Sequence, residues 1–362
     1  MSLPDPSTIL PGLPPGAEVL ILRLRSLGDV VMLTPALEAV HAWRPDLRLC
    51  VMVEPAFAPV LEGNPAVSEI LLFESFFPAA RALRRRKFPV TFNHHAGPTS
   101  AWLTLAAGSP VRVTWADRQY QAFYNVRVPA AQAFFGGSKV HTAEHRMTQF
   151  YWTGLPRGPV PAARVYPQAA ARASVRLSLI AHEITSQTPY AVIHPGAAYF
   201  TKRWNIAQFA GVARWLEAQH GIYSVVALGP GDRGIAAEVR EAFGPQAPIL
   251  DALSLHELIA LLAGARIFVG NDSGPAHLAA AAGRPAVVIF GSSDSVTWQP
   301  WQTPHRVVQN DFPCNPCRGD RCYAFDEPRC ILSVTPEQVK EACQSLLDDE
   351  KQKRQSELSI LN

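Results

Sequence analysis

The sequence predicts an α/β protein with two domains, each built on a parallel sheet. Short apolar runs of strand length alternate with segments of helical character, and this alternation begins near residue 18 and starts again near residue 190. Strand–helix–strand repeats at such spacing form right-handed crossovers between parallel strands. The length of 362 residues agrees with two domains, because a domain commonly holds about 100–200 residues.

The composition excludes several classes of protein. Hydrophobic residues make up 48% of the chain and charged residues 17%, which rules out a mainly disordered chain or a chain-long coiled coil. A net charge of +3 gives no reason to expect nucleic acid as a partner. No run approaches the roughly 18 apolar residues of a membrane-spanning helix, and the proline-rich start lacks the basic region of a signal peptide. We expect a cytoplasmic protein whose contact with a membrane is at most peripheral.

The first domain is expected to alternate strands and helices. The strands are expected at residues 18–24, 49–53, 70–73 and 88–93, and the helices at 30–43 and 79–87. Pro35 is compatible with the first helix if it lies in the opening turn. The helix at 79–87 is rich in arginine, and its basic face is either simply solvated or a surface for phosphates or anionic lipid headgroups.

The second domain repeats this pattern. Its strands are expected at residues 190–194, 223–228, 266–269 and 286–290, and its helices at 205–219, 275–282 and 335–347. The last helix opens with T-P-E-Q, a capping sequence with proline at the first helical position. The chain is therefore divided into a flexible tail (1–17), a first domain (18–165), a linker (166–187), a second domain (188–334), a final helix (335–348) and a polar tail (349–362). The linker is expected to contain a short helical piece that ends near residue 184.

Three strand-to-helix junctions carry candidate functional residues, because ligands of open α/β sheets bind beyond the carboxyl ends of the strands. The first junction reads R-S-L-G-D and ends at Asp29. This carboxylate either stabilises the start of the following helix or serves as a general base. The junction lacks the G-x-G-x-x-G fingerprint, which argues against a hydride-transfer enzyme.

The second and third junctions have the character of anion sites. The second reads H-P-G-A-A-Y-F-T-K-R-W, in which Thr201 offers a hydroxyl and Lys202 a positive charge to a diphosphate, although a solvated basic pair is the alternative. The third reads G-N-D-S-G-P-A-H, and Asp272, Ser273 and Gly274 precede a helix whose N–H groups can meet an anion.

The three motifs in this order resemble glycosyltransferase family 9, the ADP-heptose:lipopolysaccharide heptosyltransferases. The K-R-W form of the second motif is most similar to the heptosyltransferase II type, and the resemblance extends over residues 19–339. It implies a GT-B fold, in which two Rossmann-like domains with parallel sheets face each other across a cleft. It further implies a final helix that packs back toward the first domain.

The family resemblance also implies an activity. It implies metal-independent, inverting transfer of heptose from ADP-L-glycero-D-manno-heptose to the lipopolysaccharide inner core, at the cytoplasmic face of the inner membrane. The resemblance makes Asp29 the general base and Lys202 the ligand of the donor diphosphate. Asp272, with the N–H groups of Ser273 and Gly274, is expected to contact the donor as well.

Acceptor contacts and donor identity are less closely defined. Arg25, His94 and His95 lie after strands of the first domain and are weaker candidates for acceptor binding, since loop histidines often have no such role. The segment 198–200 departs from the acid that many family members carry there. Two alternatives therefore stay open: a family 9 enzyme with another nucleotide-sugar or acceptor, and a non-catalytic nucleotide-sugar-binding scaffold.

Four of the six cysteines are concentrated between residues 314 and 330. They are Cys314, Cys317, Cys322 and Cys330. Such density is compatible with a structural zinc ion or an iron–sulfur cluster. Thiols that pack without metal are the alternative, and no cofactor is expected to be required for transfer.

Overall fold

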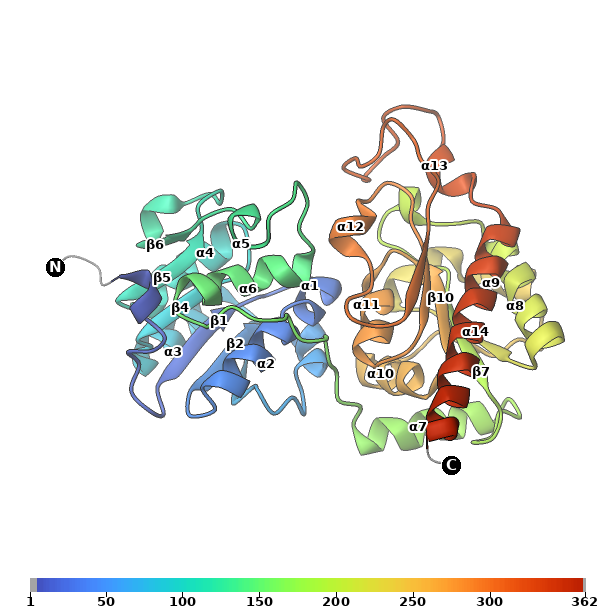
Figure 1. Cartoon of the computed structure of the whole chain (residues 1–362), viewed down its shortest axis with the longest axis horizontal. Helices are drawn as coiled ribbons and strands as arrows, with labels where there is room; N and C mark the ends of the chain where they lie inside the picture. The colour runs from blue at the N-terminus through green and yellow to red at the C-terminus, as the bar shows by residue number, and fades with distance from the viewer. Residues whose placement is uncertain (1–4, 361–362) are drawn as a thin grey trace. The chain divides into compact units, whose positions relative to one another are not determined.

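The structure is a computed structural model that describes residues 5–360. The chain divides into two compact units, unit 1 (Met1–Tyr166) and unit 2 (Pro167–Asn362). Each unit is described by itself. In Figure 1, unit 1 runs from blue to green and unit 2 from green to red.

Unit 1 is built on a six-stranded parallel sheet. Its strands are β1 (Glu18–Leu22), β2 (Arg48–Val53), β3 (Glu69–Leu72), β4 (Val90–Asn93), β5 (Val111–Trp115) and β6 (Val126–Val128). They lie in the order β3-β2-β1-β4-β5-β6, and every neighbouring pair is parallel. This is the order of a Rossmann sheet, in which the winding direction reverses between β1 and β4.

Helices connect these strands. They are α1 (Leu27–Val31), α2 (Thr34–Trp43), α3 (Phe76–Arg86), α4 (Pro98–Ala107), α5 (Gln132–Phe135) and α6 (Thr142–Trp152), with 3-10 turns at Pro6–Thr8, Pro55–Val60 and Gln121–Phe123. The single helix expected at 30–43 is in fact two, α1 and α2. Pro35 lies in the first turn of α2, where its missing N–H costs nothing, so the helix restarts there.

The expectation of a flexible tail at 1–17 is wrong for the residues that the structure describes. Residues 5–17 contain a 3-10 turn, and the side chains of Ile9 and Leu10 are buried. The Arg44 guanidinium donates hydrogen bonds to the carbonyl oxygens of Leu10 and Leu13, each at 2.9 Å. The two apolar residues therefore anchor this segment on unit 1, although prolines surround them.

Unit 2 repeats the same topology. Its strands are β7 (Tyr190–His194), β8 (Tyr223–Ala227), β9 (Ile249–Leu250), β10 (Ile267–Asn271), β11 (Ala286–Ile289) and β12 (His305–Val308). They form a second parallel sheet in the order β12-β11-β10-β7-β8-β9, with the reversal between β7 and β10. Two six-stranded parallel sheets confirm the predicted α/β class, and their continuous apolar runs are typical of strands buried on both faces.

The helices of unit 2 cover this sheet. They are α7 (Ala169–Ile180), α8 (Ile206–His220), α9 (Ala236–Phe243), α10 (Leu255–Gly264), α11 (Gly274–Ala281), α12 (Ser295–Trp298), α13 (Arg329–Leu332) and α14 (Pro336–Ile360), with 3-10 turns at Phe200–Lys202 and Pro230–Ile235. Within residues 5–360, none of the helices has the length and apolar character needed to cross a bilayer.

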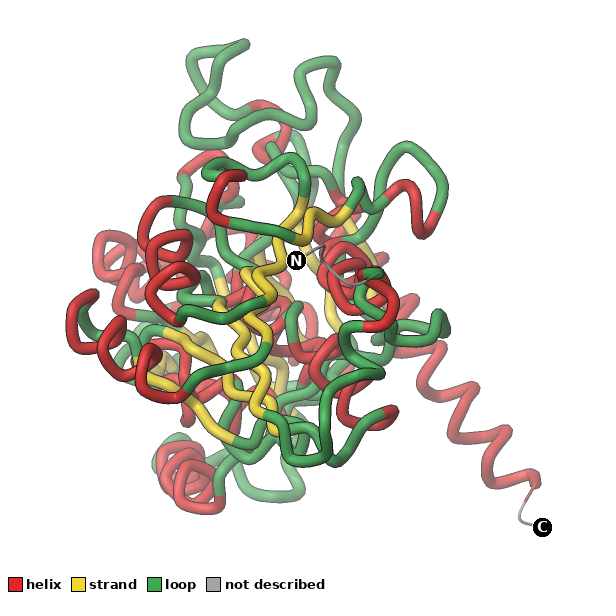
Figure 2. The backbone as a smooth tube through the Cα atoms, turned by 90° about the vertical axis from the view of Figure 1, so that its left-hand side faces the viewer, coloured by secondary structure: helices red, strands yellow, loops and turns green. Residues whose placement is uncertain are grey.

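Two of the predicted boundaries in unit 2 need correction. The linker expected at 166–187 contains α7, which packs on α10 and buries Ala171, Val175 and Leu179 at helical spacing. The final helix continues through most of the expected polar tail, to Ile360 (Figure 2). Most of its residues after 348 are Glu, Lys, Gln, Arg or Leu, which favour helix.

The final helix α14 packs within unit 2, against β11, β12 and α8. Ion pairs tie its polar part down, from Arg266 to Glu350 at 2.8 Å and from Arg306 to Asp349 at 2.6 Å. The expected return of this helix to the first domain stays a prediction.

Candidate active site

The predicted site residues gather at the two points where the sheets reverse direction. In unit 1, Asp29 follows β1 and His94 follows β4, the two strands between which the winding reverses. In unit 2, Lys202 follows β7 and Asp272 follows β10, the corresponding pair. Open α/β sheets bind their ligands at such points. Each unit therefore presents one candidate site of its own.

Asp29 lies in the first turn of α1 and is held by three donors. Ser26 Oγ donates a hydrogen bond of 3.0 Å to Asp29 Oδ2, and Arg146 Nη2 donates one of 2.6 Å to Oδ1. Arg23 Nη2 forms an ion pair with Oδ2. The side chain of Asp29 is 18% exposed, whereas those of Arg23 and Arg146 are buried. The carboxylate is thus partly buried, and two guanidinium groups fix it in place.

The charges of these groups determine the ionisation of Asp29. Burial by itself would raise the pKa of Asp29, but the adjacent charges of Arg23 and Arg146 and the hydrogen bond from Ser26 outweigh burial and lower it. Burial, and then the positive charge of Arg146, lower the pKa of Arg23 to about 9. Asp29 is therefore a carboxylate at neutral pH.

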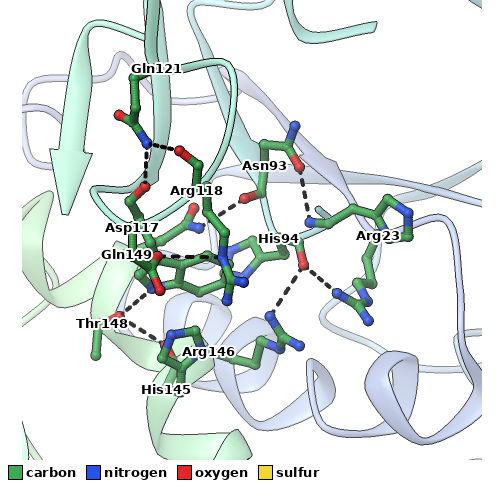
Figure 3. Close-up of polar contacts among 12 residues, drawn as sticks. Arg23, Asn93, His94, Asp117, Arg118, Gln121, His145, Arg146, Thr148 and Gln149 are labelled. Carbon is green, nitrogen blue, oxygen red and sulfur yellow. Dashed lines mark hydrogen bonds and ion pairs between the residues drawn. The ribbon is translucent and has the colours of Figure 1, made fainter. Parts of the chain in front are cut away.

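The same two arginines fix the turn after β4. Arg23 Nη1 and Arg146 Nη1 donate to the carbonyl oxygen of His94 at 2.5 Å and 3.2 Å (Figure 3). The His94 ring is fully buried and stacks on Phe150 with centroids 5.2 Å apart. The expected acceptor contact is therefore wrong for the His94 side chain in this structure: its carbonyl orients the arginines instead.

Arg25 and His95 lie closer to solvent. The Arg25 side chain is 67% exposed, and its Nε lies 4.0 Å from Glu54 Oε1. His95 is partly buried, and its N–H donates to Asn93 Oδ1 at 2.9 Å. Burial and then the charges of Arg23 and Arg25 lower the pKa of His95 to about 4. The ring is therefore neutral near pH 7, and acceptor binding by these two residues stays a prediction.

An aromatic platform adjoins Asp29. The Trp115 ring stacks on His145 with centroids 4.2 Å apart, and the guanidinium carbons of Arg118 and Arg146 lie 5.2 Å and 5.3 Å from its centroid. Trp115 Nε1 donates to Thr148 Oγ1 at 2.8 Å. The partner of Asp29 on α6, Arg146, was not predicted, because an arginine in a helix gives no sequence signal that it is buried.

In unit 2, Lys202 Nζ donates to Asp272 Oδ2 at 2.8 Å. The Lys202 side chain is partly buried and the Asp272 side chain is buried. This contact brings together the second and third predicted motifs, which lie 70 residues apart in the chain. The pair sits at the carboxyl ends of β7 and β10, next to the start of α11.

The Thr201 hydroxyl is engaged by the protein itself. The residue is 1% exposed, and its Oγ1 donates to the carbonyl oxygen of Gly319. The expectation that Thr201 offers this proton to a diphosphate is therefore wrong in this structure. Ser273 is the residue before α11, and its Oγ donates to the carbonyl oxygen of Asn271 at 3.2 Å instead of capping the helix.

The loop that carries Lys202 is fixed to the core of unit 2. Trp204 N donates to Asn271 Oδ1 at 3.1 Å, and Asn271 Nδ2 donates to the carbonyl oxygen of Pro195 at 2.7 Å. The buried Trp204 ring donates through Nε1 to the carbonyl oxygen of Val334 at 2.8 Å. Asn271 at the end of β10 therefore holds both ends of the H-P-G-A…K-R-W motif. The end at Trp204 is also attached to the segment before α14.

A buried carboxylate supports the glycine turn after β7. Asp232 Oδ2 accepts a hydrogen bond of 2.8 Å from Gly229 N and lies 3.9 Å from His194 Nε2. A Cβ atom at Gly196 would lie 2.0 Å from Asp232 Oδ1. Only glycine fits at position 196, because any side chain there would displace Asp232.

The four cysteines of the loop after β12 are reduced. Cys314, Cys317 and Cys322 are partly buried and Cys330 is buried. Burial is the main cause that raises the pKa of the Cys330 thiol. A structural metal at these residues stays a prediction.

A separate group of possible metal ligands lies in unit 1, where oxygen and sulfur atoms of Glu18, Cys50 and Glu69 lie within 4.8 Å of one another. Arg86 donates to Glu18 Oε1 and Glu69 Oε1, each at 2.7 Å. Its guanidinium provides the positive charge that these two carboxylates require.

Comparison with known proteins gives a consistent result. A model of glycosyltransferase family 9 (heptosyltransferase) matches residues 77–325. Lipopolysaccharide heptosyltransferase 3 of Escherichia coli is 27% identical over 337 residues, which cover 86% of this chain and 94% of that protein.

Two solved structures are similar to the chain in fold. The glycosyl transferase family 9 protein from Veillonella parvula DSM 2008 superimposes with a TM-score of 0.78 at 19% identity, over 92% of this chain and 97% of that chain. The E. coli ADP-heptose lps heptosyltransferase II gives a TM-score of 0.76 at 22% identity, over 92% and 99%. Both type 3 and type II proteins are therefore similar to this chain, and type II is not singled out.

The family model covers more than half of the chain and includes the second and third motifs. The protein belongs to glycosyltransferase family 9, the heptosyltransferase family.

Proposed function

We propose that the protein transfers heptose from ADP-L-glycero-D-manno-heptose to the lipopolysaccharide inner core, with inversion at the anomeric carbon and without a metal ion. The observation that carries this proposal is Asp29, an ionised carboxylate at the first sheet reversal that two buried arginines hold. Family membership and the similar ADP-heptose lps heptosyltransferase II support the choice of donor. We further propose that the enzyme works peripherally at the cytoplasmic face of the inner membrane.

In the proposed reaction, Asp29 accepts the proton of the acceptor hydroxyl. The hydroxyl oxygen forms a bond to the anomeric carbon as the bond from that carbon to the phosphate oxygen breaks, and ADP leaves with the electron pair. Arg23 and Arg146 hold the carboxylate in one orientation. A fixed base within hydrogen-bond reach contributes about 10²–10⁴-fold to the rate.

Lys202 is proposed to stabilise the negative charge that grows on the leaving diphosphate. Its ammonium group lies beside the start of α11, where backbone N–H groups add to the positive potential. The hydrogen bonds of Trp204 and Asn271 keep this loop in place before the donor binds. A preorganised cation of this kind supplies the stabilisation that a divalent ion gives in other transferases.

One observation favours a second candidate, a family 9 enzyme with a different nucleotide-sugar. Tyr199 and Phe200 are both about half exposed in the loop before Lys202, at the place where many family members carry an acid. Calorimetric titration of ADP-, GDP- and UDP-sugars, followed by transfer assays with each donor that binds, separates the two candidates. Tight binding and transfer restricted to another nucleotide would overturn the ADP-heptose assignment. A lack of transfer and of donor hydrolysis with every donor would instead indicate a non-catalytic scaffold.

A further inference from the structure

One face of α3 is both basic and aromatic, and the proposed reaction does not use it. Phe77, Arg81, Arg84 and Arg85 recur at helical spacing and fall within an arc of about 100° around the helix axis. All four are exposed, and Phe77 is 82% exposed. Lys87 follows the last turn and is exposed as well. We call these five residues the α3 outer face.

The opposite side of α3 is used for packing. Ala79 and Leu83 are buried in a core cluster formed with residues of β1 and β2. Arg86 also points to this side, where it donates to Glu18 and Glu69. Of the basic residues of α3, Arg86 is therefore paired with carboxylates inside unit 1, and the others lie on the exposed side.

The cations of the α3 outer face lack acidic partners. Among residues 5–360, no carboxylate oxygen lies within 4.0 Å of Arg81, Arg84, Arg85 or Lys87. The guanidinium of Arg84 lies beside Gly108, at the C-terminal end of α4. The other three cations have solvent as their neighbour, so their charge stays available to an external anion.

We propose that the α3 outer face docks the protein on a bilayer that contains anionic lipids. Phe77 enters the headgroup region, and Arg81, Arg85 and Lys87 meet the lipid phosphates. An exposed aromatic residue beside a basic stripe is the pattern by which interfacial helices bind such surfaces. The proposal rests on the proposed function in one respect, because a lipid-linked acceptor gives the enzyme a reason to be there.

The arrangement favours a lipid surface over a pocket for one phosphate. A phosphate pocket gathers its donors around one point, as Arg23 and Arg146 do around Asp29. The outer-face arginines, Arg81, Arg84 and Arg85, instead lie side by side along about one turn of α3. Phe77, one turn before Arg81, is 82% exposed. A row of separate cations matches an extended anionic surface, and each cation near such a surface strengthens binding about fivefold.

Vesicle sedimentation with the full chain tests this proposal. Wild-type protein is expected to bind vesicles of phosphatidylcholine with 30% phosphatidylglycerol about 100-fold more tightly than pure phosphatidylcholine vesicles, because three cations contribute about fivefold each. Arg81→Glu/Arg85→Glu should weaken binding to the anionic vesicles by at least about 25-fold, as two fivefold contributions are lost. Phe77→Ser should weaken it several-fold.

A matched control is present on α7. Arg172 and Arg176 have the same spacing as Arg81 and Arg85, are exposed, and lie near the exposed Leu177. Arg172→Glu/Arg176→Glu should leave vesicle binding unchanged within about twofold. An equal loss in this control, or equal binding to neutral and anionic vesicles, overturns the proposal. Displacement by inorganic phosphate at constant ionic strength would reveal a phosphate pocket and also overturn it.

A soluble acceptor separates this proposal from the proposed function. Arg81→Glu/Arg85→Glu should keep the wild-type KM for a core oligosaccharide that lacks lipid. A raised KM would assign these arginines to the acceptor site and contradict membrane docking. If wild-type protein transfers no heptose but the vesicle results hold, the proposed function fails and the docking surface stands.

Discussion

Arg146 Nη2 donates a hydrogen bond of 2.6 Å to Asp29 Oδ1, although 117 residues separate the two in the chain. The contact joins α6 to the first turn of α1, and Arg23 completes it from the end of β1. An ionised carboxylate with two fixed guanidinium partners has one orientation and one charge state. Both properties are what a base needs before its substrate arrives.

Asp29→Asn should abolish transfer while donor affinity stays within a few-fold of wild type. The amide cannot accept the hydroxyl proton, and the residues proposed to hold the donor diphosphate belong to unit 2. The rate of ADP release is expected to fall by about 10²–10⁴-fold, with ADP affinity measured by calorimetry on the same preparation. If donor affinity falls as far as the rate, Asp29 is not the base.

Arg146→Met should move the acidic limb of the kcat profile to higher pH. Arg146 is one of the charges that lower the pKa of Asp29, and without it burial raises that pKa, so the carboxylate takes up a proton at a higher pH. Wild-type kcat should be constant between about pH 8 and about pH 5. The pKa of Asp29 lies below the usual aspartate value of about 3.9, so the carboxylate stays ionised over this range. Arg146→Lys keeps the charge and should keep the wild-type profile; a purely structural arginine would lower kcat in both variants without moving the limb.

Lys202→Ala should weaken the binding of ADP itself. A charge-assisted hydrogen bond to a phosphate contributes about 1.5–3 kcal/mol, which corresponds to about 10–100-fold in Kd. Arg214→Ala, on the exposed side of α8 in the same unit, is a control that should leave the affinity unchanged. Equal ADP affinity in wild type and Lys202→Ala would remove the diphosphate role.

The stability of the protein should fall as the pH decreases from 6.5, partly because of His145. Burial and then the charges of Arg146 and Arg118 lower the pKa of His145 to about 3, whereas an unfolded chain has a value near 6.5. Between these two pKa values His145 binds a proton in the unfolded state but not in the native state. The free energy of unfolding therefore falls by about 1.4 kcal/mol for each pH unit of acidification.

His145→Phe can retain the stacking on Trp115 and removes the titrating group. Urea denaturation at pH 6.5 and 5.0 should therefore show about 2 kcal/mol less acid destabilisation than wild type. His182→Gln, at an exposed position, should behave as wild type. If His145→Phe and wild type show the same pH dependence, His145 has the same pKa in the native and unfolded states, and this prediction is wrong.

Transfer should continue after treatment with EDTA, because Lys202 and the start of α11 are proposed to stabilise the leaving diphosphate. Metal analysis of the same sample reports separately on Cys314, Cys317, Cys322 and Cys330. Loss of activity with EDTA that added Mg²⁺ restores would contradict the metal-independent mechanism. Loss of bound zinc or iron with unchanged kcat would agree with a structural metal in the cysteine loop.

The strands of both sheets were predicted wherever their apolar runs are continuous. β1 and β7 are buried on both faces, so every position prefers an apolar residue and the pattern is unmistakable. β5 and β6 were not predicted, since Arg112 and Arg127 interrupt their short runs. The short helix α7 was expected but was assigned to a linker, because prolines dominate the composition before it.

Only part of the candidate site was predicted, and there is a physical reason why some of its residues could be predicted and others could not. Asp29, Lys202 and Asp272 were proposed from their places at strand ends together with the resemblance to family 9, and each lies at a sheet reversal. Burial of Arg146 and of the His94 ring depends on which helix covers the β1–β4 junction. That packing arises from the order of the strands, which no local pattern of residues contains.

The ion pair between Lys202 and Asp272 determines how much negative charge a ligand of unit 2 needs in order to bind there. An anion that binds Lys202 must compete with a carboxylate already 2.8 Å away, and a single negative charge offers little advantage over it. A diphosphate brings several charges and can also meet the N–H groups at the start of α11. The resting pair would then keep chloride, inorganic phosphate and nucleoside monophosphates, all abundant in a cell, out of the proposed donor site.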